Sequence, residues 1–110
     1  MDINRSIRKL VTYALEKNLI SENERIYSIN LLLDVLNLDE YVEPKEEYSD
    51  VDLESTLKEI LDWAVSKKMI EDNVVSRDLF DTKVMNCFVM RPQSVIDTFD
   101  KLKVSQSLVL

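Results

Sequence analysis

Apolar residues in the first 36 positions recur every three or four residues, which is the spacing of amphipathic helices. The first stripe predicts a helix from residue 3 to about residue 17, ended by Asn18. Its apolar positions are Ile3, Ile7, Leu10, Val11, Ala14 and Leu15. Ser21 and Glu24 then form an S-x-x-E capping box, in which each side chain satisfies a backbone amide of the other residue. This box predicts a second helix with an apolar face of Ile26, Ile29, Leu32, Leu33 and Leu36, widened by Leu31 and Val35.

Two further helices and a short fifth one are predicted beyond an acidic segment. Residues 39–52 contain one of the two prolines and many acids, so they predict a solvated connector. Asp50 or Asp52 is expected to cap a third helix that carries Leu53, Leu57, Ile60, Leu61, Ala64 and Val65, with Trp63 beside this stripe. Ser76, with Asp78 after it, is expected to cap a fourth helix containing Leu79, Phe80, Val84 and Phe88. Arg91-Pro92 then interrupts the helix, and Val95, Ile96, Phe99 and Leu102 indicate a short fifth one.

The pattern as a whole predicts an all-α fold of about five helices. We expect a single domain over 1–110, built from two helical hairpins and a short C-terminal helix. The expected parts are a hairpin over 3–38, an acidic connector over 39–52, a hairpin over 53–90, a helix over 93–103 and a tail over 104–110. Strand signals are weak and are confined to NVVS and SLVL.

An internal similarity appears at an offset of 50 residues. IRKLVTYALEKNLI, residues 7–20, aligns with LKEILDWAVSKKMI, residues 57–70. Ala14 aligns with Ala64, and Tyr13 aligns with Trp63. Two amphipathic helices look alike by necessity, which is one explanation. The other is a pair of hairpins packed about a pseudo-twofold axis, since two units are fewer than a solenoid needs.

Composition removes several classes of chemistry. The 110 residues include no glycine and no histidine. Without glycine there is no P-loop, dinucleotide fingerprint or nucleophile elbow. Without histidine there is no Ser-His-Asp or Cys-His catalysis and no covalent histidine intermediate. We therefore expect no catalytic residues and no cofactor.

Charge limits the partners in the same way. The formal net charge is −7, from 14 basic and 21 acidic residues, so nucleic acid and anionic membrane surfaces are not expected partners. With no signal peptide or transmembrane segment apparent, we expect a cytoplasmic protein. Cys87, the single cysteine, is expected to be a small core residue in VMNCFVM.

Two patterns that could hold ligands have simpler explanations. Asp50, Asp52 and Glu54 alternate as in a calcium loop, but Ser55 and Leu61 replace the turn glycine and the bidentate acid, so no metal site is expected. Tyr13, Trp63 and Phe80 could stack on a base or sugar. Aromatic residues at helical spacing are more typical of a core.

The segment from Ser76 to Lys83 combines several charged and hydroxyl side chains around Leu79 and Phe80. On a helix, Asp78 and Thr82 share a face, and Arg77 and Asp81 form a second pair four residues apart. SRDLFDTKVMNCFVMRPQSVIDTF resembles a stretch near the amino terminus of the second, mainly bacterial class of galactose-1-phosphate uridylyltransferases. LVTYALEKNLISENERIYSINLLLDVLNL also resembles the beginning of that family, so the likeness spans about residues 5–102.

The resemblance implies a parent enzyme that transfers UMP from UDP-glucose to galactose 1-phosphate. In that family the UMP is carried covalently by a histidine in a motif far downstream, which this chain lacks. We therefore expect a helical domain that is inactive alone and meets the catalytic domain of its parent enzyme. The residues expected on this family-motif surface are Arg77, Asp78, Asp81, Thr82, Lys83, Arg91 and Pro92.

The sequence also departs from the family pattern. Asn86 and Cys87 follow Met85 where the family has glycine, and Val89-Met90 replaces a Thr-Pro pair. After Leu102, KVSQSLVL does not continue like the family, which suggests a truncated gene product or an artificial boundary.

Two other functions are kept open. One is a stand-alone helical protein–protein interaction module that binds a partner or itself as a homo-oligomer, through its four methionines and the tail Ser107-Leu108-Val109-Leu110. The other is residual binding of a UDP-sugar or sugar phosphate by Arg77, Lys83 and Arg91.

Overall fold

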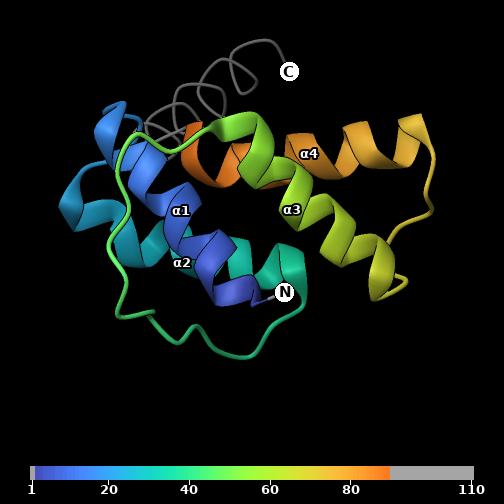
Figure 1. Ribbon diagram of the computed structural model, residues 1–110, viewed down its shortest axis with the longest axis horizontal. Helices are drawn as coiled ribbons and strands as arrows, with labels where there is room; N and C mark the ends of the chain where they lie inside the picture. Colours follow the sequence, from blue (N-terminus) through green and yellow to red (C-terminus); the bar gives the residue numbers. More distant parts are fainter. Residues whose placement is uncertain (1, 90–110) are drawn as a thin grey trace, which may run out of the picture.

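Four α-helices and one short 3₁₀ turn form the described part of the chain, as Figure 1 shows. The computed structural model describes residues 2–89. Its elements are α1 (Ile3–Glu16), η1 (Glu22–Glu24), α2 (Arg25–Leu36), α3 (Leu53–Ser66) and α4 (Val74–Val89). The all-α class is confirmed. The predicted helix over 93–103 and the tail over 104–110 lie outside the described residues.

Helix α1 begins and ends where the sequence pattern predicts. Asp2 caps its first turn, because one of its carboxylate oxygens accepts the Asn4 amide at 3.0 Å. After the last helical residue, Asn18 adopts the left-handed conformation with φ of 57°, and the Leu19 amide reaches the Ala14 carbonyl at 2.9 Å. This closure satisfies an otherwise free carbonyl, so Asn18 stops the helix as expected.

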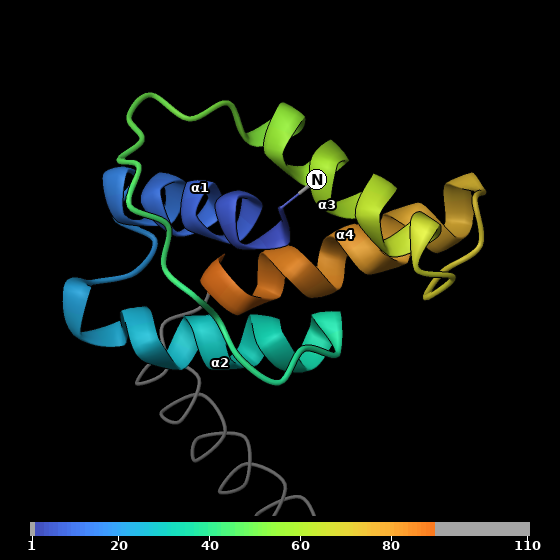
Figure 2. The ribbon, with the colours of Figure 1, turned by 60° about the horizontal axis from the view of Figure 1, so that its bottom comes forward.

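The predicted capping box at the start of α2 is present. The Ser21 amide donates to a carboxylate oxygen of Glu24 at 2.8 Å, and the box opens η1, which continues into α2. Ile29, Leu32, Leu33 and Leu36 are buried as predicted. Ile26 is 73% exposed, which contradicts its assignment to the buried face. In Figure 2 the first turn of α2 extends past the described end of α4, so α4 does not cover this turn.

The acidic connector crosses the surface without regular structure, but it is fastened to the helices. Glu46 forms an ion pair with Arg5 at 3.0 Å, and Glu43 contacts both Arg8 of α1 and Arg25 of α2. Tyr41 packs partly buried against the core. The prediction of a solvated connector is therefore right for most of its acids and wrong for Tyr41.

Helix α3 repeats the geometry of α1 at an offset of 50 residues. Asp52, the second of the two predicted candidates, caps it by accepting the Ser55 amide at 3.2 Å. At its other end Lys68 adopts φ of 59°, and the Met69 amide donates to the Ala64 carbonyl at 2.9 Å. The cap positions, lengths and closing turns of α1 and α3 thus correspond at an offset of 50 residues.

Helix α4 begins two residues before the predicted cap. The Ser76 amide donates to the side-chain oxygen of Asn73 at 2.8 Å, and the Arg77 amide donates to the Asn73 carbonyl at 3.0 Å. Asn73 therefore caps α4 in place of Ser76, and NVVS joins the helix start instead of forming a strand. Asn86 and Cys87 lie inside the helix, so α4 continues where the family pattern has glycine.

The core lies between the two halves of the chain. Its buried members come from all four α-helices, and the most extensive packing pairs α1 with α3 and α2 with α4. In Figure 2, α4 lies between α1 and α2. Because each helix packs chiefly on the opposite half, the two predicted hairpins are not self-contained units. The pseudo-twofold axis stays a prediction, although the matched ends of α1 and α3 favour it.

Candidate functional site

The residues of the family motif lie along α4 but do not form one cluster. Arg77 is held by two carboxylates: its Nε donates to Asp72 at 2.8 Å, and its Nη2 donates to Asp62 of α3 at 3.1 Å. The hydrogen bond to Asp72, followed by the one to Asp62, raises the pKa of the guanidinium above its ordinary value. Arg77 thus tethers the start of α4 to α3, and its charge is already paired.

The two side-chain pairs predicted on this helix are not formed. Thr82 donates its hydroxyl to the Asp78 carbonyl at 3.0 Å, whereas the Asp78 side chain is exposed. Asp81 does not pair with Arg77, since both described ion pairs of Arg77 go elsewhere. One buried oxygen of Asp81 has no hydrogen-bond partner among the described residues. Burial and the nearby charge of Asp78 raise the pKa of this carboxyl.

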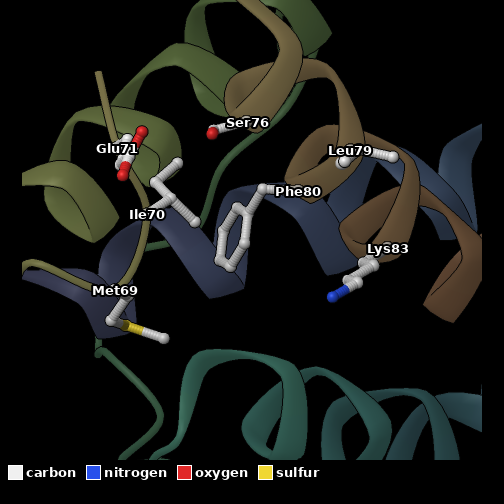
Figure 3. A pocket seen from close by; sticks show the side chains of 7 residues that line it. All are labelled: Met69, Ile70, Glu71, Ser76, Leu79, Phe80 and Lys83. Carbon is white, nitrogen blue, oxygen red and sulfur yellow. The ribbon is translucent and has the colours of Figure 1, made fainter. Parts of the chain in front are cut away.

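Lys83 faces a groove between α2, the turn before α4, and α4 itself. Two adjoining hollows of about 450 and 430 Å³ share Met69, Ile70, Phe80 and Lys83. We call the two hollows together the α2–α4 groove. In Figure 3 the Phe80 ring projects between Ile70 and Lys83, with Leu79 on the same helix beside it. The groove joins an apolar floor to one cation at its side.

Leu79 lies on α4 as predicted, but it is not part of the core. Leu79 is 62% exposed, and Val74 and Val75 on the same helix are 73% and 69% exposed. Phe80, Val84 and Phe88 are buried as predicted, so the core-facing side of α4 is offset from Leu79. Of the seven predicted surface residues, Arg91 and Pro92 lie outside the described residues, and only Lys83 lines the groove.

Other candidate ligand sites receive simpler explanations. Asp52 serves as a helix cap, and the described residues contain no cluster of three or more His, Cys, Asp or Glu side chains placed to bind a metal. Phe80 belongs to the core, whereas Trp63 lines a separate hollow of about 360 Å³. Cys87 is a buried free thiol, as expected. Across residues 2–89, no helix has the length and apolar composition that a membrane span requires.

One charged cluster was not predicted from the sequence. Arg8 and Arg25, which are 17 residues apart, converge on Glu43, and Tyr41 lies in the same neighbourhood. The Arg8 Nε and the Tyr41 hydroxyl are buried without hydrogen-bond partners among residues 2–89. Burial raises the pKa of Tyr41, partly opposed by the positive charges of Arg8 and Arg25. No local spacing signals this cluster, because its members come from three separate segments.

The relatives found by comparison with known proteins share one name. The chain is 49% identical over 100 residues to the galactose-1-phosphate uridylyltransferase of Butyrivibrio fibrisolvens, an alignment that covers 91% of this chain and 26% of that protein. The chain is similar to one segment of the galactose-1-phosphate uridylyltransferases. The enzyme of Clostridium acetobutylicum is 46% identical over 102 residues, and that of Fusobacterium nucleatum is 37% identical over 103 residues. These alignments cover 91% and 93% of the chain and 20% of each enzyme.

The resemblance inferred from RDLFDTK is therefore confirmed at the level of homology. The chain spans only about a fifth to a quarter of the length of these curated galactose-1-phosphate uridylyltransferases. No protein-family model matches the chain, and no solved structure matches it significantly.

Proposed function

We propose that this chain is a helical part of a galactose-1-phosphate uridylyltransferase and does not itself carry the residues that transfer the nucleotide. The observation that carries the proposal is the 49% identity over 91% of the chain, confined to 26% of the relative. On this proposal the parent enzyme moves UMP between UDP-glucose and galactose 1-phosphate, as the sequence resemblance implies. The chain supplies a packed helical unit that the rest of the enzyme uses.

The chemistry of the described residues supports a structural role. Histidine is absent from the whole sequence, so a histidine nucleophile cannot come from this chain. Arg77 is paired with two aspartates, which leaves it poorly suited to bind a phosphate group. The buried thiol of Cys87 has a pKa raised to about 11, first by burial and then by Asp34, so little of it is thiolate near neutral pH.

A transfer assay tests the proposed inactivity directly. The purified chain is incubated with UDP-glucose and galactose 1-phosphate, and formation of UDP-galactose is measured beside the Butyrivibrio fibrisolvens enzyme. We expect no turnover by the chain under conditions in which the relative is active. Measurable turnover that survives repeated purification would contradict the proposal.

The alternative of a stand-alone interaction module has one observation in its favour. Val74, Val75 and Leu79 are exposed on α4, and apolar residues gathered on a surface often mark contact with another protein. Light scattering over a range of concentrations distinguishes self-association from a monomer. A stable homo-oligomer would favour the module, whereas a monomer would support the role in a larger enzyme.

A further inference from the structure

The outer surface of α4 forms one continuous apolar area with the α2–α4 groove. Val75 and Leu79 are one helical turn apart and share a face, and both are largely exposed. Leu79 also lines the groove beside Phe80. We call Val75, Leu79, Met69, Ile70, Phe80 and Lys83 together the α4 surface. Its exposed apolar side chains would be more stable if covered.

Lys83 places a positive charge beside the apolar residues of this surface. Its side chain lines both hollows, and none of the ion pairs described within residues 2–89 involves it. A carboxylate placed in the groove would meet an unpaired ammonium group. The surface therefore suits a partner that brings an apolar side chain to the floor and an acidic one to Lys83.

The relatives are much longer than the segment that this chain matches. The matched segment accounts for 20–26% of the relatives, so most of a homologous enzyme lies outside it. We propose that the α4 surface docks onto the portion of a galactose-1-phosphate uridylyltransferase outside the matched segment, with an acidic side chain of that portion beside Lys83. This inference rests on the proposed function and adds the contact surface to it.

A second copy of the chain fits this surface less well. Each copy carries a formal net charge of −7, so two copies repel one another. Asp34 and Glu71 also border the groove and outnumber Lys83, so two facing grooves would both carry a net negative charge. Among residues 2–89, Lys83 is the single basic residue lining the two hollows.

A chimera tests the docking in a complete enzyme. The matched segment of the Butyrivibrio fibrisolvens enzyme is replaced by this chain, and Leu79→Glu is introduced. The matched control is Ile26→Glu, because Ile26 is also largely exposed but lies in the first turn of α2, about 13 Å along the helix from Val35 beside the groove. The same two substitutions are made in the isolated chain. Thermal inactivation of the chimera and thermal unfolding of the isolated chain are then measured.

We expect Leu79→Glu to lower the inactivation midpoint of the chimera by about 5 °C or more. Ile26→Glu should lower it by less than about 1 °C, and the isolated chain should respond about equally to both substitutions, since neither residue is buried there. Lys83→Gln in the chimera should give a smaller shift that shrinks at high salt, because it removes only the charge contact.

The outcomes separate the two proposals. An active wild-type chimera in which Leu79→Glu has no more effect than Ile26→Glu overturns the docking inference and leaves the proposed function standing. A wild-type chimera without transferase activity contradicts both. A dimer of the isolated chain that Leu79→Glu dissociates would show that a second copy covers the surface, and would also overturn the inference.

Discussion

Cys87 has no ionic role, and burial governs its chemistry. Its side chain is 4% exposed, and its thiol donates to the Lys83 carbonyl at 3.4 Å. Desolvation, with a smaller effect of the Asp34 charge, raises the thiol pKa from 9.0 to about 11. The folded protein therefore holds this proton more tightly than the unfolded chain does.

This shift predicts a loss of stability at alkaline pH. Below pH 9 both states keep the proton, so the thiol has no effect on stability there; between pH 9 and about 11 only the unfolded state releases it. The free energy of unfolding should fall by roughly 1 kcal/mol from pH 8 to pH 10 through this group. Urea unfolding of the wild type and of Cys87→Ala at both pH values measures it. Equal declines in the two proteins would contradict the prediction, because tyrosine and lysine titrations are common to both.

Residue burial was predictable wherever a helix packs along its whole length. The apolar spacing correctly placed Ile7, Leu32 and Ile60 in the core. It failed for Ile26, and it did not show that Leu79 would be exposed. Spacing along one helix does not reveal where the neighbouring helix ends or which side of a stripe it covers.

Helix ends in this chain must close without glycine. Left-handed residues are Asn18, Asn37, Asp50 and Lys68, with φ between 50° and 59°. The Cβ atom makes this conformation unfavourable for residues other than glycine. Asparagine and aspartate tolerate it because their side chains hydrogen-bond locally, which a lysine side chain does not do. The end of α3 is thus less favourable than the equivalent end of α1.

Lys68→Gly should stabilise the protein. Removing the Cβ from a left-handed position relieves strain, and we expect a gain of about 0.5–1 kcal/mol in the free energy of unfolding. The matched control is Lys67→Gly, whose φ of −88° suits any residue, so glycine there should give a loss. Denaturant melts of both variants provide the comparison, and a loss at both positions would show that Lys68 is not strained.

Helix starts were predictable where a capping side chain forms a hydrogen bond with a nearby backbone amide. The Ser21–Glu24 box was found from spacing alone, and Asp52 was one of the two caps predicted for α3. The start of α4 was misplaced because Ser76 and Asp78 look like a cap, and because two β-branched valines favour a strand. Asn73 forms the cap instead, since packing of α4 on α2 and tethering by Arg77 favour a helix from Val74 onward.

At the scale of the molecule, Glu43 joins parts of the chain that are far apart in sequence. It binds Arg8 and Arg25, whose side chains are 19% and 22% exposed. Glu46 makes the comparable contact with Arg5, which is 56% exposed. The Glu43 contacts should contribute more to stability than the Glu46 contact. Without Glu43, two partly buried guanidinium groups would lie close together with no carboxylate between them.

Glu43→Gln should therefore destabilise the fold more than Glu46→Gln. We expect a loss of about 1–2 kcal/mol for Glu43→Gln, and of less than about 0.5 kcal/mol for Glu46→Gln. Unfolding by urea at low and high salt measures both, and salt should reduce the smaller effect further. If the two variants lose equal stability, the Glu43 cluster does not clamp the connector.

The candidate site could be predicted only in part from the sequence. The motif RDLFDTK pointed to the relatives that the chain resembles and lies on α4, and Lys83 does line the groove. Neither the groove nor the Glu43 cluster could be predicted, since each combines residues from segments that meet only after folding. Met69 and Phe80 share a surface because the turn after α3 and helix α4 line the same hollow as Val35 of α2.

The pairing of α1 with α3 and of α2 with α4 also bears on synthesis at the ribosome. A nascent chain that ends before residue 74 has made α1, α2 and α3, yet it lacks the helix that lies between α1 and α2 (Figure 2). Its leucine and isoleucine side chains stay exposed to solvent and to other nascent chains during this interval. We therefore expect cooperative folding of residues 2–89 only after α4 has left the exit tunnel.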